Sequence, residues 1–445
     1  MKAVLFAIAA LAAFPAAAID VKGLKSPDGL TAYLNEDHGN QVVAISYFFA
    51  GGSALDPADK AGLSNFAVAL LDEGAGERDS LAFQNELEDR SIRWRISADG
   101  DSIGGSITVT TDNLDAALDL LKLALTQPRF DADAIERIGK QILVKIKSDT
   151  ENPGRIAGAA MMKALFGDHP YARVDDGTAA SVAALTADDF KAWAKARFAK
   201  DRLIIAASGD ITPRQLGRAI DRAFGALPAT TGLQVAVPLA AVDSKPEVIR
   251  IEKNLPQSTI YFGQRGMKRS DPDWYAAQVI DYVFGAGSFQ SRLMDGVREK
   301  RGLAYSVSSS LQPLDAGAFI LAASGTRADA ADKAVAVIRE EWRKLHDSGI
   351  TADELQGAKD YMTGAWPLRF TATTRIADTL IAVQRDKLGL DYLDRRNELI
   401  NKVTLADANR VARALYDPDQ LKVVVVGRVG PPPAPVPAPA PATAR

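Results

Sequence analysis

The chain carries one pattern of residues twice, LTADDFKAWAKARFAKDRLIIAASG at residues 185–209 and VTLADANRVARALYDPDQLKVVVVG at residues 403–427. In each copy a threonine is placed to cap an amphipathic helix, an aromatic residue closes the helix, and an apolar run typical of a buried strand follows before a glycine. A second pair of stretches begins at Asp133 and Asp353, an offset of 220 against 218 for the first pair. Two offsets this similar predict two homologous domains.

We expect the first domain to span residues 22–228 and the second residues 246–430, joined by a linker at 229–245 that has prolines at both borders. In each copy strands come first, and helices and further strands then alternate. This order predicts an α+β fold in which a mostly antiparallel sheet is covered on one face by helices.

Five elements of the first domain can be placed from their pattern. The apolar runs at 30–34 and 42–49 flank a turn-rich segment, which predicts a β-hairpin. Residues 106–111 form a further strand-like run, and 114–125 and 132–147 have helical periodicity.

The two ends of the chain are predicted to lie outside the fold. Residues 1–18 have a lysine near the start, an apolar run of twelve from Ala3 to Phe14, and small residues before Asp20, which is typical of a cleavable signal peptide. We therefore expect an exported protein, periplasmic or secreted. No later stretch reaches eighteen apolar residues without a charge, so we expect no membrane span. Residues 431–445 are rich in proline and alanine and predict an extended tail, more commonly a spacer than a ligand for a proline-reading domain.

The composition excludes several chemistries. The 445 residues include no cysteine and three histidines, His38, His169 and His346, with no two of them at ligand spacing. A chain without cysteine has no thiol nucleophile, disulfide, iron–sulfur cluster or thiolate zinc site. The formal net charge of −3 provides no basic field for a phosphate backbone, so nucleic acid is not an expected partner.

The stretch KAGLSNFAVALLDEG at residues 60–74 follows the first strands. Its apolar residues recur at helical spacing: Leu63, Phe66, Leu70 and Leu71. The setting, with a glycine before the helix, an aromatic within it and an acidic residue and glycine at its end, resembles the insulinase, pitrilysin and mitochondrial-processing-peptidase family. Active members of that family carry an inverted zinc motif, H-x-x-E-H, at this point.

The resemblance implies that this chain has lost the zinc chemistry. The two histidines and the glutamate of the motif correspond to Asn65, Ala69 and Val68. An amide is a poor zinc ligand and the aliphatic side chains offer no donor atom, so Asn65 is left to cap or hydrogen-bond within its helix. The family's third ligand falls at or beside Lys145, where there is no carboxylate. We expect no metal in this chain.

The second domain resembles the half of the family that does not bind zinc. There an arginine stands seven residues before a tyrosine, as Arg298 stands before Tyr305, and both side chains reach towards the zinc of the partner domain. The resemblance also implies that Gly285 and Gly287 belong to a flexible linker that lines the cavity. Gly302 suits the residue after a helix, where a left-handed backbone is needed. Without the resemblance, the local sequence favours placing Arg298 on a solvated charged face and Tyr305 in a half-buried strand.

The resemblance covers residues of about 25 to 428 and implies a non-catalytic subunit of a heterodimeric zinc endopeptidase that degrades peptides or unfolded polypeptides. The partner is then a homologous chain with an intact inverted zinc motif, which brings the zinc. Arg298 and Tyr305 would stabilise negative charge on the peptide carbonyl and orient the substrate. The alternative is a stand-alone pseudo-peptidase, a peptide-binding or scaffold protein. An independent serine or acid–base hydrolase has no nucleophile motif to support it.

Overall fold

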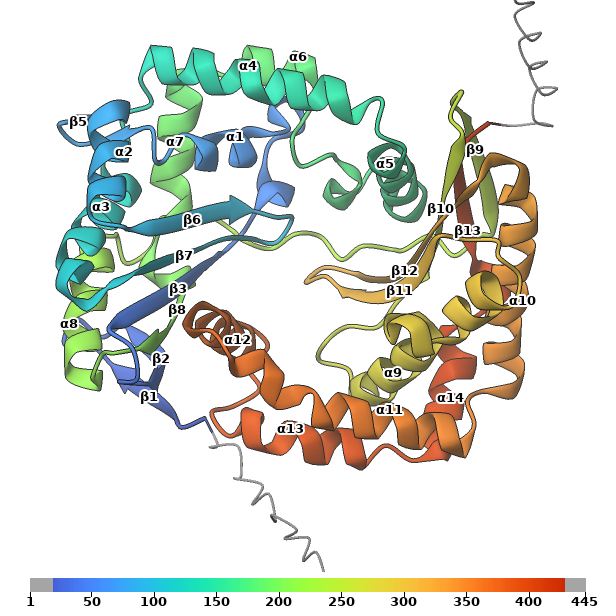
Figure 1. The fold of residues 1–445 in the computed structure, drawn as a ribbon. Coiled ribbons are helices and arrows are strands. Elements are labelled where there is room, and N and C mark those ends of the chain that lie inside the picture. Colours follow the sequence, from blue (N-terminus) through green and yellow to red (C-terminus); the bar gives the residue numbers. More distant parts are fainter. Residues whose placement is uncertain (1–18, 429–445) are drawn as a thin grey trace, which may run out of the picture.

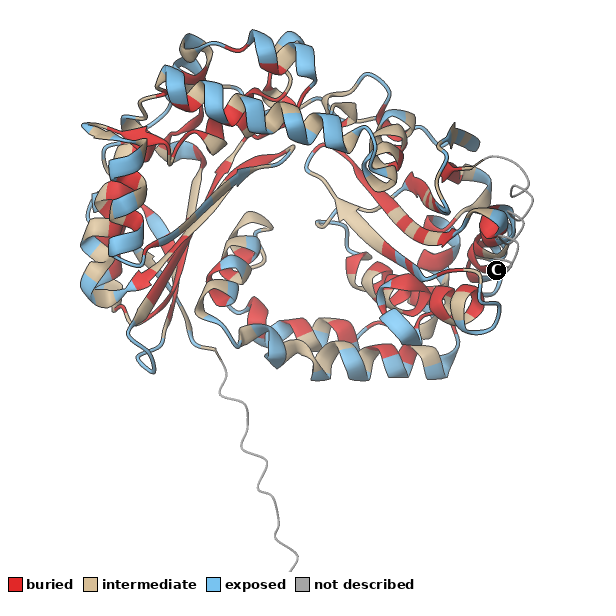
Figure 2. Ribbon diagram, turned by 45° about the horizontal axis from the view of Figure 1, so that its top comes forward, coloured by how far each residue is buried: buried red, intermediate tan, exposed pale blue. Residues whose placement is uncertain are grey.

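The computed structural model describes residues 19–428, so the predicted signal peptide (1–18) and the predicted tail (431–445) lie outside the described residues. The chain forms two halves, each with one mixed sheet and helices packed on it, arranged around a common centre (Figure 1). The sheets are mostly antiparallel and covered by helices, which confirms the predicted α+β class with two domains. Buried positions gather along the sheets and the helix faces that contact them (Figure 2).

The first sheet has six strands in the order β1-β2-β8-β3-β7-β6. Only β2 and β8 run parallel to each other. The strands are β1 (Val21–Lys25), β2 (Thr31–Glu36), β3 (Val42–Ala50), β6 (Arg93–Ala98), β7 (Ser102–Thr110) and β8 (Leu203–Gly209). A separate short pair is formed by β4 (Gly74–Ala75) and β5 (Arg78–Asp79).

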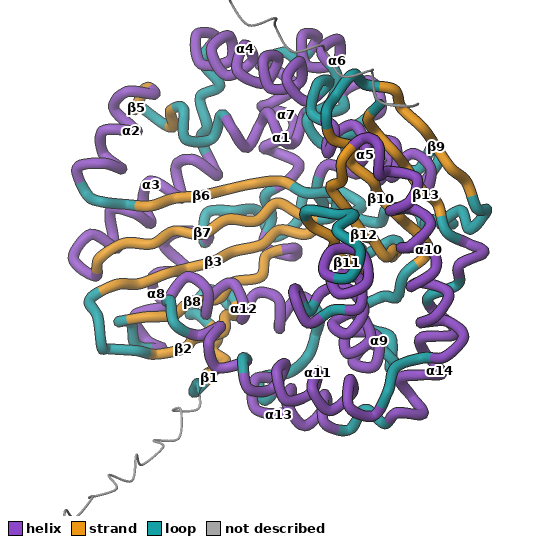
Figure 3. Tube along the Cα trace, turned by 45° about the vertical axis from the view of Figure 1, so that its right-hand side comes forward, coloured by secondary structure: helices purple, strands orange, loops and turns teal. Residues whose placement is uncertain are grey.

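The predicted hairpin between residues 30–34 and 42–49 is wrong. Both strands exist, but β8 lies between them and pairs with each, as Figure 3 shows. The residues of β8 from Ile205 to Gly209 are all buried. Such a continuous apolar run fits a central position, covered on both faces and bonded on both edges. The strand after the long helical excursion therefore takes the place next to β3 that a hairpin partner would occupy.

The second sheet repeats this arrangement with five strands in the order β11-β12-β10-β13-β9. Here β13 takes the place that β8 has in the first sheet, between an antiparallel neighbour, β10, and a parallel neighbour, β9. The strands are β9 (Glu247–Glu252), β10 (Gln257–Arg265), β11 (Ser306–Pro313), β12 (Ala318–Arg327) and β13 (Lys422–Gly427).

The repeated sequence has the same structure in both halves. Helix α7 (Ala187–Arg197) precedes β8, and α14 (Leu405–Leu415) precedes β13. Each begins with a capping box, in which the Thr186 or Thr404 side chain accepts a backbone N–H and an aspartate three residues later bonds back to the threonine.

The two halves exchange one helix each. Helix α5 (Pro153–Phe166) packs against β10 and β13 of the second sheet, and its equivalent α12 (Thr373–Arg385) packs against β2, β3 and β8 of the first (Figures 1 and 3). The Ser46 hydroxyl on β3 donates to the Asp378 carboxylate on α12 over 2.6 Å, and the Gln384 side chain donates to the Ile205 carbonyl over 2.8 Å. Each sheet is therefore covered on its inner face by the other half.

The remaining helices lie on the outer faces and around the rim. In the first half they are α1 (Leu63–Ala69), α2 (Ser80–Asp89), α3 (Leu114–Thr126), α4 (Ala132–Asp149), α6 (Ala179–Ala184), α7 and α8 (Pro213–Phe224). In the second half they are α9 (Trp274–Asp281), α10 (Ala331–Ser348), α11 (Ala352–Gly364), α13 (Tyr392–Asn401) and α14. No helix within residues 19–428 combines the length and apolar character needed to cross a membrane.

A buried hydrogen-bonded joint connects the halves at the turns of their sheets. The Tyr171 hydroxyl donates to the Asp101 carboxylate, which lies at the β6–β7 turn, and accepts from the Ala316 N–H over 2.9 Å. Asp101 also accepts from the Asp315 N–H over 3.0 Å. Asp315 and Ala316 lie in the β11–β12 turn, so the Tyr171 and Asp101 side chains together tie the two sheets.

Candidate functional site

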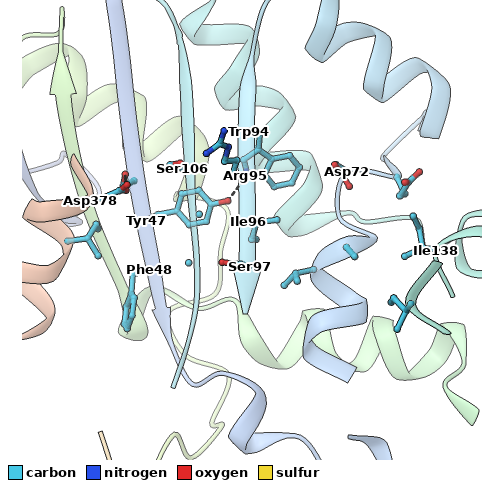
Figure 4. A pocket seen from close by; sticks show the side chains of 18 of the residues that line it. Tyr47, Phe48, Asp72, Trp94, Arg95, Ile96, Ser97, Ser106, Ile138 and Asp378 are labelled. Atoms are coloured by element: carbon cyan, nitrogen blue, oxygen red, sulfur yellow. Dashed lines mark hydrogen bonds between the residues drawn. The ribbon is translucent and has the colours of Figure 1, made fainter. Parts of the chain in front are cut away.

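A cavity of about 920 Å³ opens beside α1 and the edge strand β6 (Figure 4). Residues from both halves line it, because α12 crosses over from the second half. They include Val68 and Ala69 of α1, Trp94 and Arg95 of β6, Lys145 of α4 and Asp378 of α12. The cavity therefore lies where the degenerate zinc motif faces the exchanged helix.

Local sequence fixes α1 at the wall of this cavity. Gly62 caps the helix at φ +93°, and a Cβ there would approach the Asp176 carbonyl oxygen to 2.6 Å, so the position requires glycine. Ser64 donates its N–H and its hydroxyl to the buried Asp56 carboxylate, which also pairs with Arg197 over 3.0 Å. Burial raises the pKa of Asp56 despite these bonds. The helix is thus held by its own first turn and by a buried ion pair.

The structure brings two of the three motif positions into the cavity. Val68 and Ala69 line it, whereas Asn65 is half-buried and is not the cap of the helix, a place taken by Gly62. The idea that Asn65 caps the helix is therefore wrong. The two lining side chains carry only carbon, so this wall of the cavity has no donor atom for a metal.

Lys145 also lines the cavity, in the region of the family's third ligand. Its ammonium group donates to Asp176 and, over 3.1 Å, to Asp149, and Arg155 bonds to the same two carboxylates. Partial burial opposes ionisation, but these bonds raise the pKa of Lys145, so it remains a cation. A fixed cation repels a metal ion, and the residues at the four positions do not fit zinc.

No other part of the described chain makes up for this loss. Within residues 19–428, no three His, Cys, Asp or Glu side chains come together closely enough to hold a metal ion. The histidines are far apart in the fold and each has a local partner: His38 bonds to Asp210, His169 to the Pro238 carbonyl and His346 to Asp347.

Sequence reasoning missed the acidic side chains that reach the cavity. Asp378 comes from the other half, and only the exchange of α12 brings it there. Asp72 and Glu73 lie at the end of the quoted motif stretch, where their sequence position is a usable signal. Burial raises the pKa of the Asp72 carboxyl, whereas the bond from Arg137 lowers that of Glu73.

Arg298 and Tyr305 lie in the second half, and neither is among the residues that line the cavity beside α1. Arg298 belongs to a π-helical turn (Met294–Glu299), and Gly302, three residues after this turn, has the left-handed conformation expected from the sequence, φ +60°. The Tyr305 N–H bonds to the Gly325 carbonyl just before β11, and its side chain is 55% exposed. The guanidinium of Arg298 has one carboxylate neighbour, Glu299, at 3.6 Å. Both side chains are accessible from solvent.

The glycines of the adjacent segment are packed against their surroundings. A Cβ on Gly285 would lie 2.5 Å from the Ser309 nitrogen, and one on Gly287 would lie 2.6 Å from the Tyr282 carbonyl oxygen. Both glycines are buried. They allow the chain to turn closely against β11, and their place at the wall of a substrate chamber stays a prediction.

Together the duplicated half, the exchanged helix and the aliphatic motif positions define a class: a two-domain zinc-peptidase fold whose metal ligands have been replaced. Comparison of sequences specifies the family. The profile of the insulinase family (peptidase family M16) matches residues 31–174, and that of the peptidase M16 inactive domain matches residues 184–362. The chain belongs to the M16 family and is one of its inactive members.

Relatives and solved structures agree with the assignment to this family. The chain is 25% identical to a protein named non-peptidase homolog YmxG from Helicobacter pylori, over 88% of this chain and 90% of that one. It is 24% identical to an uncharacterized zinc protease, YmxG, from Bacillus subtilis, over 90% and 96% of the two chains. The crystal structure of a peptidase M16 inactive domain from Pseudomonas fluorescens superposes with a TM-score of 0.87 at 27% identity, covering 92% of this chain and 98% of that chain.

Proposed function

We propose that this chain is the non-catalytic, substrate-orienting subunit of a heterodimeric zinc endopeptidase that degrades peptides or unfolded polypeptides. One observation carries the proposal: the positions that hold zinc in active relatives carry an amide, an aliphatic and a cationic side chain (Asn65, Ala69 and Lys145), while Arg298 and Tyr305 remain accessible. A chain that has lost its metal ligands but keeps an exposed pair of hydrogen-bond donors is suited to assist a reaction that occurs on another chain.

The chemistry of the pair supports this role. Attack on a peptide carbonyl places negative charge on its oxygen, and an arginine guanidinium and a tyrosine hydroxyl are donors that stabilise such charge. In the proposed assembly Arg298 and Tyr305 bind and orient the substrate backbone. The zinc is supplied by a homologous chain with an intact inverted zinc motif, and this chain itself holds no cofactor.

The compartment is part of the same proposal. The first 18 residues have the pattern of a cleavable signal peptide, which supports export to the periplasm or beyond the cell. The net charge of −3 supports a peptide rather than a nucleic acid as the bound polymer.

A second function, a stand-alone peptide-binding or scaffold protein, is supported by the cavity beside α1. Among the described strands β6 pairs with β7 alone, so its other edge faces this cavity with free backbone groups. An extended peptide can add to such an edge as a further strand. A chain working in this way retains peptides without cutting them.

The test uses this chain and a homologous chain that has the intact motif, encoded in the same genome, each alone and both mixed, with zinc and a fluorogenic peptide. The proposal predicts cleavage by the mixture well above that of either chain alone, and a stable complex of the two chains in size-exclusion chromatography. Cleavage by this chain alone would contradict it. Peptide binding by this chain without any complex would favour the stand-alone function.

A further inference from the structure

We infer that Phe289 is the positioning residue of Arg298, holding its guanidinium against an exposed aromatic ring in the orientation needed to meet a peptide carbonyl. The inference rests on the proposed function, because it concerns how one member of the Arg298 and Tyr305 pair is prepared for substrate.

The contact itself is a cation–π pair. The Arg298 guanidinium carbon lies 5.0 Å from the centre of the Phe289 ring, within the distance at which a cation is attracted to an aromatic face. The competing carboxylate, Glu299, is its sequence neighbour, lies 3.6 Å away and has a side chain that is 55% exposed. At 3.6 Å this pair is too long for a hydrogen bond, and water screens it, so it restrains the arginine weakly. The ring is therefore the better-defined contact of Arg298.

The backbone around Phe289 is shaped to present this ring. Ser288, directly before it, has a φ of +53°, a conformation that residues other than glycine rarely adopt. Just before this serine, Gly285 and Gly287 pack so closely that a Cβ at either position would clash, which fixes the start of the turn. As a result Phe289 is 64% exposed instead of joining the core of the second half. The backbone here is unusual, and it places a large apolar ring in solvent beside the arginine. The cation–π contact with Arg298 is a local interaction that accounts for this arrangement.

Restraining Arg298 has a direct consequence for the reaction. An unrestrained arginine samples many rotamers, and this freedom is lost when it binds a carbonyl oxygen. An arginine that is already held by a ring loses less conformational entropy when it binds, so its hydrogen bond in the transition state is more favourable. A positioning residue of this kind acts on kcat and leaves KM nearly unchanged, because the ground-state contacts of the substrate are made elsewhere.

The test measures kcat and KM of the two-chain mixture with variants of this chain. We expect Phe289→Leu, which keeps an apolar side chain but removes the ring, to lower kcat about fivefold with KM within about twofold. Phe289→Tyr keeps the ring and should restore kcat. Two controls should match the wild type: Glu299→Gln, which removes the competing carboxylate, and Leu368→Ala, which truncates an apolar side chain of similar exposure, 66%, in the same half.

The possible outcomes distinguish a failure of this inference from a failure of the proposed function. If Arg298→Ala leaves the mixture fully active, the proposed function fails. If Arg298→Ala abolishes activity but Phe289→Leu does not change kcat, the function stands and the inference is overturned. NMR of the isolated chain with labelled arginine decides the contact without any activity: the Arg298 Nε–Hε group should become more mobile in Phe289→Leu and not in Phe289→Tyr. Equal mobility in all three proteins would overturn the inference.

Discussion

The buried carboxyl of Asp281 gives a prediction whose size follows from the structure. Asp281 ends α9, directly before the π-helical turn that contains Gly285, and accepts from the Ser309 hydroxyl over 2.5 Å. Burial raises the pKa of Asp281 to about 6 from an ordinary value of 3.8, because the charged form loses its hydration. The native state thus holds this proton more tightly than the unfolded chain, so the free energy of unfolding falls as the pH rises through the window from 3.8 to about 6.

The difference between these two pKa values corresponds to about 3 kcal/mol, lost in full above pH 7. About 1.5 kcal/mol of that loss falls between pH 5 and pH 8. Asp281→Asn keeps an oxygen that can accept from Ser309 but cannot ionise. We therefore expect the variant to gain about 1.5 kcal/mol on the wild type when the pH is raised from 5 to 8.

Urea denaturation at a series of pH values, followed by circular dichroism, measures this difference. A companion variant, Ser309→Ala, removes the hydrogen bond that favours the charged form, so it should raise the pKa of Asp281 further and steepen the pH dependence. If the wild type and Asp281→Asn lose stability in parallel across pH 5 to 8, the carboxyl does not titrate in this window and the reasoning from burial is refuted.

Three other predictions concern the joint, the packed turn and the metal. Tyr171→Phe removes the hydroxyl that bridges the two sheets, so it should lower the free energy of unfolding, measured by urea denaturation, by about 2–3 kcal/mol. Tyr361→Phe, at an exposed site, should change it little. Equal effects of the two variants would contradict a stabilising role of the joint. Gly285→Ala should lower the thermal midpoint and reduce the free energy of unfolding by about 1–3 kcal/mol, because the new Cβ clashes with Ser309. Gly357→Ala, whose new Cβ has no neighbour within 4 Å, should be neutral or stabilising. A zinc chelator should leave the thermal midpoint of the isolated chain unchanged, and a drop would reveal a metal that the residues do not predict.

The part of the fold that local sequence encodes was predictable. The threonines at 186 and 404 and the aspartates three residues after them form capping boxes, which bonds between near neighbours dictate. The apolar runs that follow form interior strands, with a neighbour on each edge, in both halves. The class of fold and the membership of the M16 family followed from these repeats and from the motif stretch at residues 60–74.

What local pattern does not encode is which segments meet across the chain. The place of β8 between β2 and β3 depends on pairing between residues some 160 apart, and the apolar character of β8 alone does not reveal its neighbours. The exchange of α5 and α12 has the same origin, since an amphipathic helix shows that one face is buried but not against which sheet.

The candidate site likewise has features that the sequence reveals and features that only the fold reveals. The loss of the two zinc ligands at Asn65 and Ala69, and of the motif's glutamate at Val68, is visible in the sequence, because it depends only on residue type. The cation–π contact between Phe289 and Arg298 depends on a left-handed serine that directly follows two close-packed glycines, and on a neighbouring π-helical turn, none of which has a simple sequence signal. The same holds for the carboxylates that hold Lys145.

The central claim is that this chain orients a peptide substrate that is cleaved at the zinc site of another chain. The most direct measurement is the kcat of the two-chain mixture with wild-type protein and with the double variant Arg298→Ala and Tyr305→Phe, at equal complex concentration. Loss of the two donors to the developing charge should lower kcat by about a hundredfold or more while the complex still forms. A double variant that is as active as the wild type in an intact complex would contradict the account.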